Sequence, residues 1–175
     1  MILKFICGVA TAATIAFAGQ AMAQTSENIV AANTDWTVFV ENNPKECWSV
    51  SAPKQTINTR DGKTVSVQRS DIRLFVFYRP GEKVQGQVAF TGGYPFASGS
   101  TADMNINGTK FQLFTEGEWA WPATAEDDAK IVTAMKRGAD AVLTARSGRG
   151  TLTQDTFSLL GFTATVEEAA KRCSG

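Results

Sequence analysis

The side chains in this sequence that could do chemistry are cysteines and carboxylates, because the chain of 175 residues contains no histidine. Its three cysteines are Cys7, Cys47 and Cys173. No pair of them has the Cys-x-x-Cys spacing of a redox-active dithiol. Histidine is the usual base in Ser-His-Asp and Cys-His systems, and it shares most zinc sites with cysteine. The residue types therefore predict no metal site and no nucleophile activated by histidine.

Carboxylates are the remaining candidates, and they cluster at residues 126–128 and 167–168. Each cluster lies at the start of a predicted helix, where acidic side chains complement the helix dipole. No calcium-loop pattern is present, and the glycine pair at residues 92–93 lacks the following Lys-Ser/Thr of a phosphate loop. We predict no catalytic residue and no cofactor. The alternative is a hydrolase that acts on carbohydrate through carboxylates from distant positions.

The first 23 residues have the pattern of a signal peptide. Lys4 precedes an apolar run, and Ala21-Met22-Ala23 forms the small-x-small motif of a cleavage site. The apolar run is too short to span a bilayer. We predict cleavage after Ala23 and a flexible leader over residues 24–33. The mature chain, without a transmembrane segment, is expected in the periplasm, on the outer surface or in the medium.

Export places the two remaining cysteines in an oxidising compartment, where they should pair. A Cys47–Cys173 bond would close most of the mature chain into one loop. In the chain-entropy model, a loop of this length stabilises the fold by about 4–5 kcal/mol. The alternative is two free thiols. We predict the disulfide, which would tie the C-terminal segment to the first strands.

The mature chain contains a succession of short alternating or apolar segments that are separated by turn residues. Residues 72–78 are apolar on both faces, which is typical of a central strand covered on both sides. Asn107-Gly108 is the strongest signal for a two-residue hairpin turn. The predicted strands cover residues 34–40, 47–51, 64–68, 72–78, 84–90, 104–106, 109–114, 141–145 and 150–157.

One helix is predicted inside this pattern and a second one at its end. Thr124 and Asp127 fit a capping box, an apolar stripe follows at helical spacing, and Gly138 suits the end of the helix. A shorter helix is predicted over residues 166–172, directly before Cys173. The sum is an all-β sandwich in a single domain, with one inserted helix and a short C-terminal helix.

Four aromatic residues are candidates for a contact surface. Trp119 and Trp121 flank a single alanine, so both indole rings lie on one face of an extended segment. They could form an exposed contact surface, since tryptophan is enriched in interface hot spots. We favour the alternative, that both rings pack under the helix starting at Ala125. Tyr94 and Phe96 raise the same two alternatives and are interpreted in the same way.

Five segments of the chain, taken in order, resemble a known protein family. They are Asp35-Trp36-Thr37-Val38, Cys47-Trp48, Met135-Lys136-Arg137-Gly138, Phe157-Ser158-Leu159-Leu160-Gly161-Phe162 and Ala169-Ala170-Lys171-Arg172-Cys173. With the closing cysteine, they resemble the invasion-associated locus B (IalB) family of exported proteins from Gram-negative bacteria. The resemblance covers nearly all of the mature chain. Many members have an additional cysteine where this chain has Val40, so a second bridge of the family is absent here.

The resemblance implies an immunoglobulin-like β-sandwich over residues 34–175, a periplasmic or surface location and, in some pathogenic relatives, a virulence-associated link to host-cell entry. It brings no catalytic residues. The charges are balanced, with 17 basic and 17 acidic residues and no basic block, so nucleic acid is not a predicted partner. We predict an exported, non-enzymatic cell-envelope protein that binds an envelope or host-surface partner. Purely structural support of the envelope is compatible with the same sequence.

Overall fold

The computed structural model describes residues 28–174, and twelve strands within that range form one antiparallel sheet. Neighbouring strands follow the order β1-β2-β3-β6-β7-β10-β9-β8-β11-β12-β4-β5. The strands are β1 (Ile29–Asn33), β2 (Trp36–Asn42), β3 (Lys45–Ser51), β4 (Gln55–Arg60), β5 (Lys63–Thr64), β6 (Arg73–Arg79), β7 (Val84–Thr91), β8 (Thr101–Ile106), β9 (Thr109–Glu116), β10 (Trp119–Trp121), β11 (Asp140–Arg146) and β12 (Leu152–Ser158). The helices are α1 (Ala125–Met135), α2 (Phe162–Cys173) and the 3-10 turn η1 (Pro80–Glu82).

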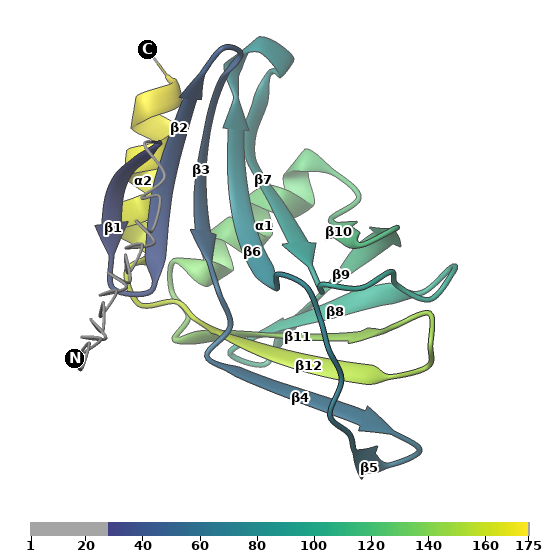
Figure 1. The fold of residues 1–175 in the computed structure, drawn as a ribbon. Helices are drawn as coiled ribbons and strands as arrows, with labels where there is room; N and C mark the ends of the chain where they lie inside the picture. Colours follow the sequence, from purple (N-terminus) through teal and green to yellow (C-terminus); the bar gives the residue numbers. More distant parts are fainter. Residues whose placement is uncertain (1–27, 175) are drawn as a thin grey trace, which may run out of the picture.

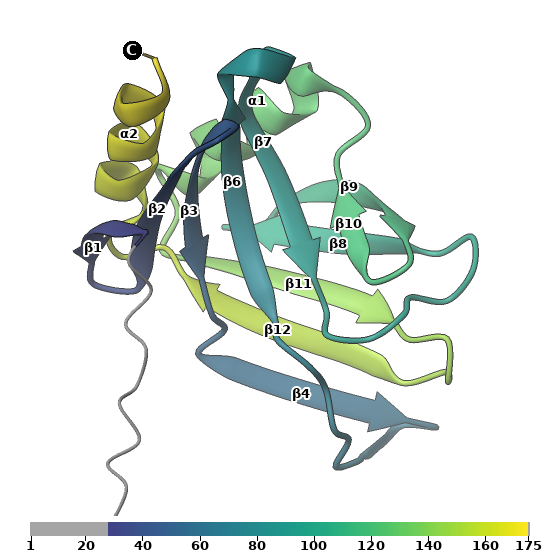
Figure 2. The ribbon, with the colours of Figure 1, turned by 45° about the horizontal axis from the view of Figure 1, so that its top comes forward.

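The sheet bends into two layers that cross steeply, as Figures 1 and 2 show. Strands β1, β2, β3, β6 and β7 form the first layer, and β9, β8, β11, β12 and β4 form the second. The short strand β10 pairs with both β7 and β9, so it joins the two layers. Helix α1 packs against β7, and α2 packs against β2 and β3. The predicted all-β, sandwich-like class with an inserted helix and a C-terminal helix is confirmed.

The hydrophobic core lies between the two layers and is closed by both helices. Trp36 shows how it is built: its indole ring is in edge contact with Phe162 of α2, at 4.8 Å between ring centres, and its Nε1 donates a hydrogen bond of 2.9 Å to the Ser158 carbonyl. This bond satisfies the one polar atom of a buried tryptophan. The core also includes Leu74, Val76, Val88, Phe90, Met104, Ile106, Leu113, Ile131, Met135, Leu143, Phe157 and Val166.

Helix α1 begins at the predicted capping box. The Asp127 backbone N–H donates to Thr124 Oγ1 at 3.2 Å, and the Thr124 hydroxyl donates to the Asp127 carboxylate at 2.7 Å. Asp128, one residue further on, is buried, and it accepts a hydrogen bond of 2.8 Å from the Val88 N–H of β7. Burial raises the pKa of Asp128, against the lowering effect of this hydrogen bond. The acidic cluster at residues 126–128 therefore caps α1 and fastens it to the sheet.

Two expectations about the ends of the chain need correction. The predicted flexible leader over residues 24–33 contains β1, which pairs with β2 in the register Asn33↔Trp36. Helix α2 begins at Phe162, four residues before the predicted start, so Glu167 and Glu168 lie outside its first turn. They form ion pairs with Lys136 at 2.8 Å and with Arg172 at 2.7 Å. The predicted signal peptide and residues 24–27 lie outside the described residues.

The strand predicted over residues 64–68 is also shorter than expected, because β5 ends at Thr64. The Val65 N–H still donates to the Asn58 carbonyl at 2.9 Å, but the chain then leaves the sheet and runs irregularly to β6. This segment carries Arg69 into contact with β12.

Within residues 28–174, no helix has the length and apolar character needed to cross a membrane.

Candidate functional site

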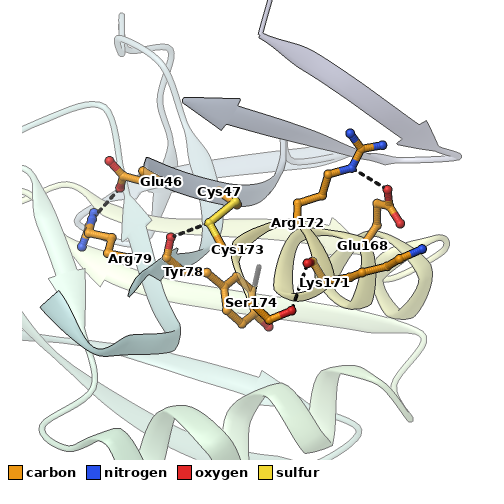
Figure 3. The surroundings of a disulfide bond; sticks show 9 residues. All are labelled: Glu46, Cys47, Tyr78, Arg79, Glu168, Lys171, Arg172, Cys173 and Ser174. Carbon is orange, nitrogen blue, oxygen red and sulfur yellow. Dashed lines mark hydrogen bonds and ion pairs between the residues drawn. A yellow bond between two sulfur atoms is a disulfide. The ribbon is translucent and has the colours of Figure 1, made fainter. Parts of the chain in front are cut away.

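The predicted disulfide is present and joins β3 to the end of α2 (Figure 3). Cys47 and Cys173 are 126 positions apart in the sequence, their sulfurs are 2.02 Å apart and their Cα atoms 5.9 Å apart. Both side chains are buried, and Val38 and Ala169 pack around them. Cys47 is fully buried and Cys173 is only 6% exposed, so little of the sulfur pair is accessible to a reductant or a thiol partner. The bond therefore has the surroundings of a structural tie.

Charged groups surround this tie at the surface. Glu46, next to Cys47, forms an ion pair of 2.5 Å with Arg79 of β6, and Arg172, next to Cys173, pairs with Glu168 within α2 (Figure 3). Burial raises the pKa of the neighbouring Tyr78 to about 12, and the Glu167 carboxylate acts in the same direction. Tyr78 is therefore neutral at physiological pH. The carboxylates of Glu46 and Glu168 are held in these ion pairs and are not directed at the sulfur atoms.

The structure places the four aromatic contact candidates in different environments. Trp119 is 40% exposed, whereas Phe96 is buried beside Phe90. Tyr94 is half-buried, and its hydroxyl lies 2.5 Å from Thr153 Oγ1. Tyr94 and Phe96 contact each other, and both follow β7 rather than β10. The four residues therefore do not form one patch.

The interpretation that both tryptophans pack under α1 does not hold for Trp119. Its ring lies on the outer face of the sheet against Phe75, at 5.6 Å between ring centres. Trp121 lies closer to the helix, where it lines a shallow hollow together with Ala125 and Asp128. Only the second ring thus approaches the start of α1.

Trp119 belongs to a larger group that sequence reasoning missed, which we call the outer aromatic row. Successive ring centres in the row are 5.4, 6.2, 5.1 and 5.6 Å apart. The strands point these rings away from the core, because Val38, Cys47, Leu74 and Val76 occupy the alternating inward positions. The row consists of Phe39, Trp48, Phe77, Phe75 and Trp119.

The row corrects one expectation about β6. Residues 72–78 were expected to be covered on both sides, but Phe75 and Phe77 are only partly buried, and their cover comes from neighbouring rings and from Arg79, 4.5 Å above the Phe77 ring. Phe39 and Trp48 also lie opposite each other on β2 and β3. Their alternation with inward residues was a usable signal, because two predicted strands each carried a large ring on the second face.

A second candidate surface is a polar hollow of about 590 Å³ at one end of the second layer. We call it the arginine pocket. It is formed by the end of β4, the irregular segment before β6, the turn after β7, the turn between β9 and β10, and the β11–β12 hairpin. Its lining includes Arg60, Arg69, Tyr94, Glu118, Arg149 and Thr153.

The floor of this pocket is a closed network around Arg69. The guanidinium donates two hydrogen bonds to Asp155, of 2.8 and 2.6 Å, and a third of 2.8 Å from Nε to the Gly92 carbonyl. It also lies 4.9 Å from the centre of the Tyr94 ring. Burial raises the pKa of Asp155, and the hydrogen bonds from Arg69 oppose this shift. Burial also raises the pKa of Tyr94, and its hydrogen bond with Thr153 opposes that shift. The floor is rigid, and its opposite charges compensate each other.

The open polar groups of the pocket can bind a ligand. Glu118 is the one acidic residue in the lining that the structure describes, and the carboxylate beneath the floor, Asp155, is fully engaged by Arg69. A two-carboxylate hydrolase needs an acid and a base on either side of a substrate. Within residues 28–174, no group of three potential metal ligands is found. The free groups are arginines, hydroxyls and amides, which are suited to hold a ligand.

Fold and surfaces together define an all-β, sandwich-like protein tied by the Cys47–Cys173 disulfide. The crystal structure of invasion associated protein B from Bartonella henselae has a similar fold, with a TM-score of 0.56 and 12% sequence identity. The similarity covers 83% of this chain and 98% of that chain. No protein-family model matches this chain, and no curated protein matches it in sequence. The fold that the IalB resemblance implied is therefore confirmed.

Proposed function

We propose that this protein is an exported, non-enzymatic binding protein of the cell envelope, of the invasion-associated locus B type. The observation that carries this proposal is the outer aromatic row. Large rings on an uncovered sheet face are a feature of contact surfaces, since aromatic residues concentrate in interface hot spots and apolar patches on monomers are usually small. Two pairs in this row, Phe39–Trp48 and Phe75–Phe77, are stacked face to face, so a partner would meet the outer edges of these rings and the exposed indole of Trp119.

Two observations support an extracytoplasmic location. The Cys47–Cys173 bond requires an oxidising compartment to form and persist, and the first 23 residues have the pattern of an exported precursor. The structural likeness to invasion associated protein B from Bartonella henselae agrees with both. Fractionation of cells producing the full chain tests this location. We expect a shortened protein without free thiols outside the cytoplasm, whereas a full-length cytoplasmic protein with free thiols would refute export.

Binding through the outer aromatic row is tested by comparing matched variants. The mature protein, its Trp48→Ala/Trp119→Ala variant and a Leu160→Ala control are immobilised and incubated with envelope extract. Leu160 is a suitable control because it is apolar and 63% exposed but lies just before α2, outside the row. We expect the double variant to lose most captured material, while the control retains it. Equal capture by all three proteins would show that the row is not the contact surface.

A further inference from the structure

The arginine pocket is preformed and has the size of a small-molecule site. Its volume of about 590 Å³ lies within the range of about 300–1,000 Å³ typical of ligand pockets. Its walls come from five separate parts of the chain, and Arg69, whose side chain is only 5% exposed, bonds to several of them. A ligand would therefore meet a fixed surface and would not have to order it, which favours affinity.

The open groups of the pocket carry an excess of positive charge. Arg69 is compensated by Asp155, but Arg60 uses only Nη2 for a hydrogen bond of 2.7 Å to Thr151. Arg149 is exposed in the turn after β11, and the described residues provide no ion-pair partner for it. Arginine binds carboxylates through two parallel hydrogen bonds, so this pair is suited to an anionic group of the ligand.

The rest of the lining favours a polyhydroxylated ligand over a bare anion. Ser66, Gln68 and Glu118 offer hydroxyl, amide and carboxylate groups that hydrogen-bond to hydroxyls. A second hollow shares Arg69 and Glu118 with the pocket and continues to Trp119 at the end of the outer aromatic row. A ligand longer than the pocket would therefore reach an exposed aromatic ring that can pack against the apolar face of a sugar.

We propose that the arginine pocket binds a carboxylate-bearing oligosaccharide, with Arg60 and Arg149 holding the carboxylate and the neighbouring units extending toward Trp119. This site meets the outer aromatic row at Trp119 but uses different chemistry. The row takes up apolar surface, whereas the pocket takes up charge and hydroxyls. Arg149 lines only the pocket and Trp48 lies only in the row, so substitutions of these two residues distinguish a failure of one surface from a failure of the other.

The experiment titrates the mature protein with two oligosaccharides of equal length. Hyaluronan hexasaccharide carries carboxylates on alternate units, and chitohexaose carries none. We expect hyaluronan hexasaccharide to bind and to shift the backbone amide resonances of residues 66–69, 93–94 and 147–151 in NMR spectra. Arg149→Gln should weaken binding about tenfold or more, as expected for the loss of a charge-assisted hydrogen bond. Arg137→Gln, which removes an exposed arginine outside the pocket, should not change it.

Defined outcomes overturn the proposal. Equal affinity for chitohexaose would show that the arginines do not recognise a carboxylate of the ligand. Resonance shifts outside the pocket would show that the ligand binds elsewhere. Displacement by inorganic phosphate at the same concentration as the hexasaccharide would identify a general anion site and refute the saccharide. Because Arg60 also bonds Thr151, Arg149→Gln is the first variant and Arg60→Gln the second, each accepted only with an unchanged melting temperature. Absence of binding to both oligosaccharides would refute the proposal directly.

Discussion

On the two faces of strand β6 in the first layer, the larger apolar side chains lie on the more exposed face and the smaller ones on the buried face, although large apolar side chains are usually expected in the core. On β6 the inward side chains are Leu74 and Val76, which are fully buried, and the outward ones are the larger Phe75 and Phe77, which are partly exposed. The inner face is covered by both helices and by the second layer. The outer rings cover one another instead. Ring size alone therefore does not indicate which face of a strand meets the core.

The difference also separates two kinds of stabilisation. Inward aliphatic side chains gain free energy by leaving water, at about 25 cal/mol per Å² of buried apolar surface. Outward rings gain less from burial and more from cross-strand ring contacts, which contribute roughly 0.2–1 kcal/mol per pair. We therefore expect substitution of the outward rings to cost less stability than substitution of the inward side chains, which leaves the rings available for a contact.

The largest expected effect comes from breaking the tie that keeps α2 on the inner face. Cys173→Ser should lower the free energy of unfolding by about 2–5 kcal/mol, because the unfolded chain regains the freedom of a long loop. Denaturant unfolding measures this change, and circular dichroism should still show a mainly β protein. Ser174→Ala, next to the tie and exposed, is the control and should unfold like the parent protein.

An unchanged unfolding midpoint in Cys173→Ser would mean that α2 holds its place through packing alone. The buried Phe162, Val166 and Ala169 and the hydrogen bond of 2.8 Å from Ser49 of β3 to Thr165 would then hold α2 on the sheet. A Cys47→Ala/Cys173→Ala variant distinguishes this case from an effect of a single remaining thiol. It should match the Cys173→Ser variant if the bond itself provides the stabilisation.

The comparison of the two faces is tested most directly on neighbouring residues of β6. Leu74→Ala should destabilise the protein by about 2–5 kcal/mol, because it leaves a cavity in the core. Phe75→Ala removes a larger side chain but should cost only about 1 kcal/mol, because its ring is partly exposed and contacts Phe77 and Trp119. Thermal and denaturant unfolding of both variants give the two values. Equal losses would show that a partner or another part of the chain covers the outer face.

Features with a local cause could be predicted from the sequence. The hairpin turn at Asn107-Gly108 joins β8 and β9, and the box at Thr124 starts α1, because turn and cap chemistry act within a few residues. The disulfide was predictable for a different reason, since two cysteines in an exported chain leave a single pairing. These predictions needed no knowledge of distant contacts.

Features with a distant cause were missed. Strand β1 exists because its backbone pairs with β2, although its own residues resemble a leader. The irregular segment before β6 follows from the attraction of Arg69 to Asp155, 86 positions later. The arginine pocket combines parts of four loops and strand ends, so no local motif indicated it. The outer aromatic row was detectable strand by strand, but its continuity depends on the strand order.

Asp128 offers a pH-dependent test on the inner face, where it is a buried carboxylate with no counterpart in the outer row. Its folded-state pKa is raised above the ordinary value of 3.8 by burial, so the fold disfavours its ionised form. The contribution of Asp128 to stability therefore falls as the pH rises from below 3.8 through the raised pKa. Asp128→Asn keeps an oxygen for the Val88 N–H and has no charge. The melting temperature of the variant should rise relative to the parent between pH 3 and pH 6, and a constant difference would contradict this.

The smallest expected change in stability is that of Trp119→Ala. The ring is 40% exposed and has one aromatic neighbour, Phe75, so its removal should cost about 1 kcal/mol or less. Unfolding in urea measures this value, with Leu152→Ala as a control at a similarly exposed apolar residue. If the outer face serves binding, this variant should lose far more affinity for a captured partner than it loses stability. A loss of stability comparable to that of Leu74→Ala would instead make Trp119 part of the folded framework, and the two faces of the first layer would then be alike in kind.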